Sequence, residues 1–183
     1  MRRSAAYTVA VLLGAAPFVG GSASAVPAGS PTAAAALATC ERADALSDDL
    51  RAQALATGMS LAEAALAASR TDALAHFAVV CNLGKQMEDA GLGLGQLFRL
   101  RRLRSELDAT LSLVPDDADV LAAKGALLLR LPRFFGGDVA EAEVLLRRAV
   151  AAEPDNGTAR CYLGRALTAR GEAAEARGLL PSC

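Results

Sequence analysis

Three glycines recur in apolar surroundings at nearly equal intervals, and this spacing constrains the fold more than any other feature of the sequence. Gly84, Gly125 and Gly164 are separated by 41 and 39 residues. A second marker keeps the same interval: Pro115 and Pro154 each follow an amphipathic run, and the Asp or Asn after each proline can cap the next helix. Repeats of about 34 to 47 residues are typical of stacked helix pairs. We therefore expect a chain of helix hairpins.

The composition agrees with helix packed on helix at close range. Apolar residues make up 53% of the 183 residues, but aromatic residues only 4%, so the apolar content is mostly Ala, Leu and Val. Ala and Leu are the best helix formers. Periodicity and turn residues predict helices at 33–57, 60–70, 72–90, 95–113, 117–131, 138–152, 157–170 and 172–180. Each hairpin has an apolar stripe that only the next hairpin can bury.

The last unit has the clearest family resemblance. Its small and apolar residues are Leu163, Gly164, Leu167, Gly171, Ala176 and Leu180, with Ala149 and Pro154 closing the unit before. At this spacing the chain resembles the tetratricopeptide repeat family. The resemblance implies an all-α, right-handed α-solenoid of about four antiparallel helix hairpins. Its repeats would be 72–115, 116–154 and 155–183, after a divergent helix pair at 33–71.

The middle unit carries an insertion between its helices, at 130–138, that suggests a second resemblance. Pro132, Gly136, Gly137 and Asp138 are similar to a segment of the T component of TRAP transporters. That resemblance implies a periplasmic accessory of solute uptake that binds a small apolar ligand. The same residues are equally explained as a turn before a helix whose N-cap is Asp138, so both interpretations stay open.

The N-terminus has the pattern of a secretory signal peptide, residues 1–25. Arg2 and Arg3 precede an apolar run at 7–19, and Ala23-Ser24-Ala25 is a small-residue cleavage site. The run is shorter than the roughly 20 residues of a membrane span, so we favour cleavage after Ala25 over an uncleaved anchor. We expect a flexible mature N-terminus at 26–32, a periplasmic or secreted protein, and no stable membrane insertion after cleavage.

Charge and residue chemistry narrow the function. Without Arg2 and Arg3, 17 basic face 20 acidic residues, a net charge of −3, which gives no electrostatic case for nucleic acid. The single His76 has no recognisable catalytic partner, and no cysteine pair has the short spacing of a redox or zinc motif. We expect a non-enzymatic protein without cofactor or metal. Arg99, Arg101, Arg102 and Arg104 form either an anion-binding patch or, as we favour, a solvated helix face, because acidic residues follow at once.

Four cysteines in an exported chain suggest two disulfides. Of the three possible connectivities, the repeat arrangement favours one. Cys81 and Cys161 occupy equivalent places two repeats apart, beyond the Cα separation of about 7 Å that a bridge allows. The second helix of the last hairpin returns Cys183 to the level of Cys161. We therefore predict Cys161–Cys183 and, by elimination, Cys40–Cys81.

The family resemblance also implies where a partner binds. In tetratricopeptide arrays the first helix of each hairpin lines a concave groove that holds a protein or peptide. The residues expected on that face are Lys85, Glu88, Asp119, Ala122, Ala126, Leu129, Thr158, Arg165 and Thr168. The Lys/Asn/Arg clamp that some members use for acidic C-termini is absent. This mixed set suits a helical or extended partner segment of modest charge.

Overall fold

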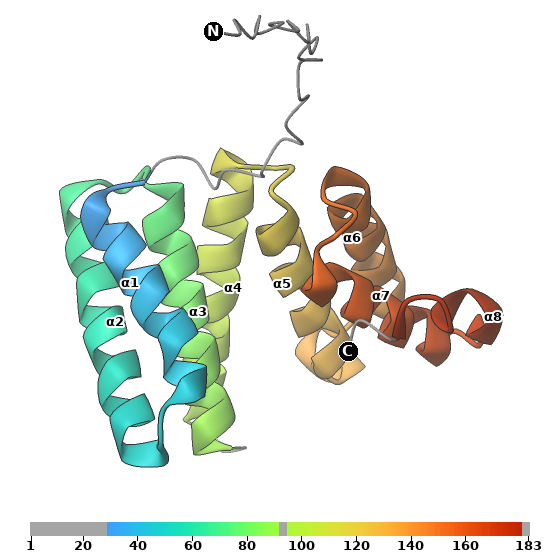
Figure 1. Ribbon diagram of the computed structural model, residues 1–183, viewed down its shortest axis with the longest axis horizontal. Coiled ribbons are helices and arrows are strands. Elements are labelled where there is room, and N and C mark those ends of the chain that lie inside the picture. The colour runs from blue at the N-terminus through green and yellow to red at the C-terminus, as the bar shows by residue number, and fades with distance from the viewer. Residues whose placement is uncertain (1–28, 92–94, 181–183) are drawn as a thin grey trace, which may run out of the picture.

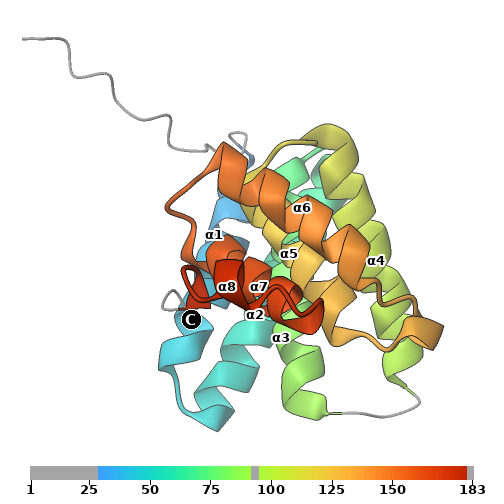
Figure 2. The same ribbon diagram turned by 90° about the vertical axis from the view of Figure 1, so that its right-hand side faces the viewer.

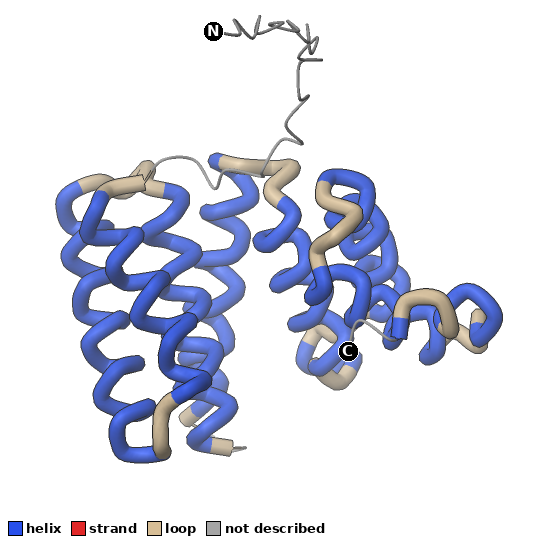
Figure 3. Tube along the Cα trace, viewed as in Figure 1, coloured by secondary structure: helices blue, strands red, loops and turns tan. Residues whose placement is uncertain are grey.

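The computed structural model describes residues 29–91 and 95–180, and the regular structure in these residues is entirely helical (Figures 1 and 3). The α-helices are α1 (Pro31–Arg42), α2 (Asp48–Ala68), α3 (Ala73–Ala90), α4 (Gln96–Leu113), α5 (Ala118–Arg130), α6 (Val139–Ala152), α7 (Gly157–Ala169) and α8 (Ala173–Ala176). Two 3-10 turns, η1 (Ala43–Ala45) and η2 (Arg133–Phe135), lie between helices. Consecutive helices pack on one another, so the predicted all-α solenoid of helix hairpins is confirmed.

The first helices of neighbouring hairpins also lie side by side in two places. Helix α1 packs on α3, and α5 packs on α7. The contact between α4 and α5 is sparser, and Figure 1 shows α1–α4 and α5–α8 as two successive blocks of the solenoid. An apolar cluster joins the blocks, because Leu107 of α4 and Val120 of α5 are both completely or nearly completely buried in it.

Capping side chains start the helices where the sequence predicts them. Asp117 follows Pro115 and accepts the backbone N–H groups of Asp119 and Val120 at the start of α5. Asn156 follows Pro154 and accepts the N–H of Ala159 at the start of α7. Asp138 likewise caps α6 through the N–H groups of Ala140 and Glu141. Each acceptor satisfies backbone donors that have no partner within the helix.

The predicted boundary inside the first hairpin is wrong. We expected helices at 33–57 and 60–70 with a break near Gly58, but the break is the 3-10 turn Ala43–Ala45 and α2 runs unbroken from Asp48 to Ala68. Gly58 is buried in α2, where a Cβ would lie 2.2 Å from Oδ1 of Asn82 on α3. This glycine therefore permits close packing of two helices, a role that sequence alone does not distinguish from a turn.

Both ends of the helical array differ from prediction. Helix α1 begins at Pro31, inside the segment 26–32 that we expected to be flexible, and the Ser30 side chain caps it. The final helix covers only Ala173–Ala176, not 172–180, and residues 177–179 form a turn. No further repeat packs against this end within the described residues, so a longer helix has little apolar surface to bury there. Residues 1–28, with the predicted signal peptide, lie outside the described part.

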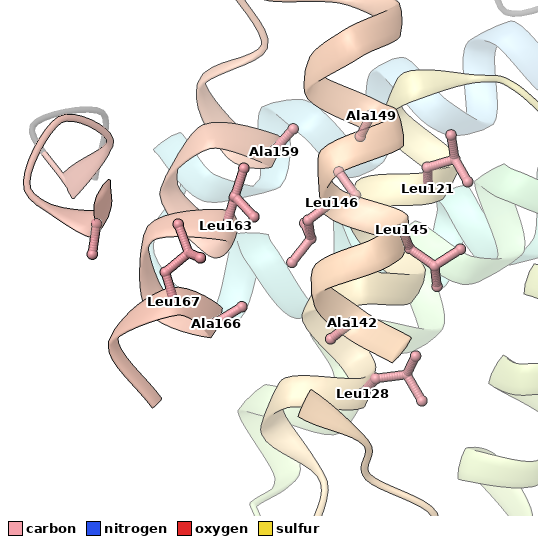
Figure 4. Packing of buried hydrophobic residues seen from close by; sticks show 12 residues of the cluster. Leu121, Leu128, Ala142, Leu145, Leu146, Ala149, Ala159, Leu163, Ala166 and Leu167 are labelled. Carbon is pink, nitrogen blue, oxygen red and sulfur yellow. The ribbon is translucent and has the colours of Figure 1, made fainter. Parts of the chain in front are cut away.

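The main hydrophobic core lies between α5, α6 and α7 (Figure 4). Leu121, Leu146 and Leu167 are completely buried, and the figure shows side chains from the three helices pointing toward one another. Gly125 lies against this core, and a Cβ there would be 2.6 Å from Cγ of Leu146. Gly125 therefore lets α6 approach α5 closely, which explains the glycine at this position of the middle repeat.

Two capping aspartates are expected to respond oppositely to loss of charge. Burial raises the pKa of Asp72, but hydrogen bonds from Ser30 and Ala75 outweigh it, so that pKa is below its ordinary value. Burial raises the pKa of Asp117 above its ordinary value. A carboxyl group whose pKa is lowered by folding adds stability above its unfolded-state pKa, and this stability is lost as the pH falls through the folded-state pKa. A carboxyl group whose pKa is raised by folding reduces stability at high pH instead.

We therefore expect Asp72→Asn to lower the free energy of unfolding by about 1 kcal/mol at pH 7, since Asn keeps the cap but not the charge. The difference from wild type should vanish near pH 2. Asp117→Asn is the matched control and should leave the free energy of unfolding unchanged or slightly higher at pH 7, because burial raises the pKa of Asp117 and so disfavours its charged form in the fold. Urea unfolding of both variants at the two pH values measures this, and equal losses at pH 7 would contradict the assignment.

Candidate binding surface

A line of polar and aromatic side chains crosses the first helices of three successive hairpins. Glu88, near the end of α3, forms an ion pair with Arg130, the last residue of α5. The pKa of Arg130 is above its ordinary value, first because of the hydrogen bond to Glu88 and also because of an electrostatic interaction with Tyr162 of α7. The guanidinium of Arg165 lies 5.0 Å from the centre of the Tyr162 ring. We call Glu88, Arg130, Tyr162 and Arg165 the polar strip.

The polar strip is an accessible surface and contributes little to stability. The side chains of Arg130 and Glu88 are 53% and 44% exposed, and such surface pairs are worth about 0 to 1 kcal/mol. Arg165 is exposed and makes no ion pair within the described residues beyond its contact with the ring. An arginine over a half-buried tyrosine offers a partner both a charge and an apolar face.

Lys85, predicted to contact a partner, instead ties α3 to the end of α1. Its ammonium donates to the backbone carbonyl of Cys40 at 2.9 Å and to the Asp44 carboxylate at 2.6 Å. The pKa of Asp44 is lowered, first by Lys85 and then by Arg51. A cation at the C-terminal end of a helix also interacts favourably with the helix dipole. This half-buried lysine is part of the scaffold, and we do not retain it as a partner contact.

The remaining predicted groove residues differ in accessibility. Ala122 and Ala126 are buried, so they serve packing within the array and are not retained as contacts. Leu129 is half-buried and packs against the main core. Those that are exposed are Glu88, Asp119, Thr158, Arg165 and Thr168. Asp119 accepts a hydrogen bond of 2.7 Å from Asn156, which links α5 to the cap of α7.

Arg130 and Tyr162 are the members of the polar strip that sequence reasoning missed. Arg130 closes α5 at the start of the insertion, where it is indistinguishable from a capping cation. Tyr162 is the single tyrosine outside the predicted signal peptide, and its place beside Gly164 on a first helix was the available signal. Only the packing of α5 on α7 brings the two side chains together.

The predicted Cys40–Cys81 disulfide is present. The bridge joins α1 to α3, with Cα atoms 6.1 Å apart, and Cys40 is completely buried. The other predicted bridge, Cys161–Cys183, stays a prediction because Cys183 lies outside the described residues. The observed bridge covalently links the first two hairpins and therefore fixes the relative position of two adjacent first helices.

The basic run on α4 is largely occupied by internal contacts. Arg99 donates to Gln86, Arg102 pairs with Glu63 and Glu106, and Arg104 donates to two carbonyl groups of the η2 turn. In the described part of the chain, Arg101 remains exposed with no ion pair. Three of the four arginines are thus bonded to other parts of the protein, whereas we expected a solvated helix face.

His76 is a bonded structural residue. Its Nδ1 lies 2.6 Å from the Glu106 carboxylate, and its Nε2 lies 2.9 Å from the Arg70 carbonyl. A carbonyl oxygen only accepts, so Nε2 donates, and the ring spans the start of α3 and the middle of α4. Within residues 29–91 and 95–180 no group of three or more His, Cys, Asp or Glu side chains is arranged to hold a metal ion.

A comparison with known protein families finds a match in the last part of the chain. Residues 136–180 match the tetratricopeptide repeat family. The match covers α6, α7 and α8, and it confirms the predicted resemblance for this part of the chain. Comparison with curated proteins found no match.

Tetratricopeptide repeats generally mediate contacts between proteins and are generally non-enzymatic scaffolds. The successive packing of helix hairpins is consistent with such repeats. Among the described helices, none is both long and apolar enough to cross a bilayer. The geometry therefore suits recognition of a partner along the surface of α3, α5 and α7.

Proposed function

We propose that this protein is an exported, non-enzymatic scaffold that binds a protein or peptide segment along the polar strip. The observation that carries the proposal is the continuous line from Glu88 through Arg130 and Tyr162 to Arg165, which spans three first helices. Arg165 offers an unpaired charge to a partner carboxylate, while Tyr162 offers its aromatic ring. A helical or extended segment of modest charge matches these groups.

Export after cleavage at Ala25 is part of the same proposal. The Cys40–Cys81 bridge supports it, because disulfides form and persist in oxidising compartments such as the periplasm and the cell exterior. The alternative of a solute-uptake accessory with an enclosed apolar ligand has less support. The two described depressions, of about 440 and 420 Å³, are open surface sites lined partly by charged residues such as Asp72 and Arg133.

Replacement of two strip arginines is expected to abolish partner capture. The chain from Val26 would be immobilised, exposed to envelope extract of its own source, and the bound proteins and small molecules identified by mass spectrometry. We expect Arg130→Gln/Arg165→Glu to reduce capture of the specific protein partner at least tenfold, because the strip loses both of its positive charges and gains a negative one.

Arg148→Gln/Arg177→Glu is the matched control. Arg148 is an exposed arginine with one carboxylate partner, like Arg130, and Arg177 is an exposed arginine of the last hairpin that lies after α8. The control should capture as wild type does, and circular dichroism should show equal folding. If the strip variant captures the same proteins as wild type, or if only small molecules are recovered, the proposed function is wrong.

A further inference from the structure

Aromatic side chains are scarce in this protein, and three of the five in the described residues are exposed. The described residues contain four phenylalanines, of which Phe98 is 78%, Phe134 80% and Phe135 41% exposed. Leu97 beside Phe98 is 41% exposed. Large exposed apolar side chains that cluster on a soluble array mark a contact surface.

Two elements distant in sequence carry these exposed side chains, and an arginine holds the two elements together. Arg104 of α4 donates to the backbone carbonyl groups of Phe135 at 2.6 Å and Gly136 at 3.0 Å. Figure 2 shows the segment after α5 reaching out at the edge of the molecule beside α4. Leu97, Arg101 and Arg104 fall on one face of α4, at i, i+4 and i+7.

Unpaired positive charge accompanies the apolar groups. Arg101 and Arg133 are both exposed, and neither forms an ion pair within residues 29–91 and 95–180. We call the following six residues the aromatic edge: Leu97, Phe98, Arg101, Arg133, Phe134 and Phe135. Exposed rings beside unpaired arginines match the chemistry of an anionic bilayer surface, where rings enter the interface and guanidinium groups meet phosphates.

We propose that the aromatic edge docks the protein peripherally on an anionic phospholipid surface. Phe98 and Phe134 are about 80% exposed, and neither described depression is lined by a leucine or phenylalanine of the edge. Four apolar side chains bury far less than the roughly 800 Å² per partner of a stable protein interface. A bilayer needs no shape complementarity and complements the positive charge. The edge shares no residue with the polar strip, although Arg130 of the strip and Arg133 of the edge are three residues apart in the chain.

Vesicle sedimentation tests the proposal. The chain from Val26 keeps all the described helices and lacks the predicted signal, which would itself bind lipid. We expect it to bind vesicles of equal parts phosphatidylglycerol and phosphatidylcholine, and to bind pure phosphatidylcholine at least tenfold more weakly. Phe98→Ser/Phe134→Ser should reduce partitioning of the protein onto the anionic vesicles at least tenfold. Arg101→Gln/Arg133→Gln should reduce it roughly tenfold or more, and the binding that remains should depend little on salt.

Leu50→Ser/Val144→Ser is the matched control, because these apolar side chains are also exposed, 53% and 60%, but lie elsewhere. It should bind as wild type does. The chain has no Trp, so Phe134→Trp and Val144→Trp each introduce a single reporter. Only Phe134→Trp fluorescence should shift to the blue with anionic vesicles. The proposal is wrong if the protein does not bind those vesicles, or if the control loses as much vesicle binding as Phe98→Ser/Phe134→Ser. It is also wrong if the protein forms concentration-dependent dimers that Phe98→Ser/Phe134→Ser abolishes.

Discussion

Loss of the Cys40–Cys81 disulfide is expected to lower the free energy of unfolding by about 4 kcal/mol. The bridge closes a loop with a sequence separation of 41 residues. If a disulfide stabilises by reducing the entropy of the unfolded chain, a loop of this size contributes between about 3 and 4.7 kcal/mol. The loss is large relative to the roughly 5 to 15 kcal/mol of an ordinary domain. Urea unfolding of Cys40→Ala/Cys81→Ala against wild type measures it.

Single replacements provide the control for that experiment. Either Cys40→Ala or Cys81→Ala alone breaks the bridge, so each should show most of the loss and the double variant little more. Reductant should lower the stability of wild type by more than that of the double variant. If the two single losses simply add, the loss comes from packing of the two side chains and not from the covalent bond.

Leu146→Ala is expected to lower the free energy of unfolding by about 3 kcal/mol, the second large effect. Leu146 is completely buried where α5, α6 and α7 meet, and truncation of such a leucine costs about 2 to 5 kcal/mol because the cavity fills incompletely. Gly125→Ala alone should cost about 1 to 3 kcal/mol, since its Cβ would lie 2.6 Å from the Leu146 branch carbon.

Combination of the two changes tests the contact directly. In Gly125→Ala/Leu146→Ala the new methyl group enters the space that the leucine vacates, so the combined loss should be smaller than the sum. Gly84→Ala is the matched control. Its Cβ would meet only Leu103, at 4.0 Å, and the gain in helix propensity should make it neutral or stabilising by up to about 1 kcal/mol. Additive losses, or a costly Gly84→Ala, would contradict this packing.

These glycines show how far sequence alone predicts the packing. Gly84, Gly125 and Gly164 occupy equivalent places in the repeat, and the helices around them are predicted correctly. Their environments nevertheless differ: a Cβ at Gly164 would lie 3.1 Å from Leu180, between the close contact at Gly125 and the open space at Gly84. The spacing of helices depends on side chains from other segments, which a repeat interval does not specify.

Local signals alone determined much of this protein. Apolar periodicity, capping side chains after Pro115 and Pro154, and the 39–41-residue interval depend on neighbours within a turn or a repeat, so they could be read directly from the sequence. The Cys40–Cys81 pairing followed from that repeat arrangement. The same signals failed in the first hairpin, because a glycine at a helix contact and a glycine at a turn are alike in sequence.

Tertiary structure decided which polar groups are available to a partner. Lys85 was predicted to contact a partner, but packing of α1 on α3 directs its ammonium to Cys40 and Asp44. The Glu88–Arg130 pair joins residues 42 positions apart. Arg104 donates a hydrogen bond to the backbone carbonyl of Phe135, 31 residues later in the chain. Contacts of this range depend on the geometry with which successive hairpins stack, and no local propensity determines that geometry.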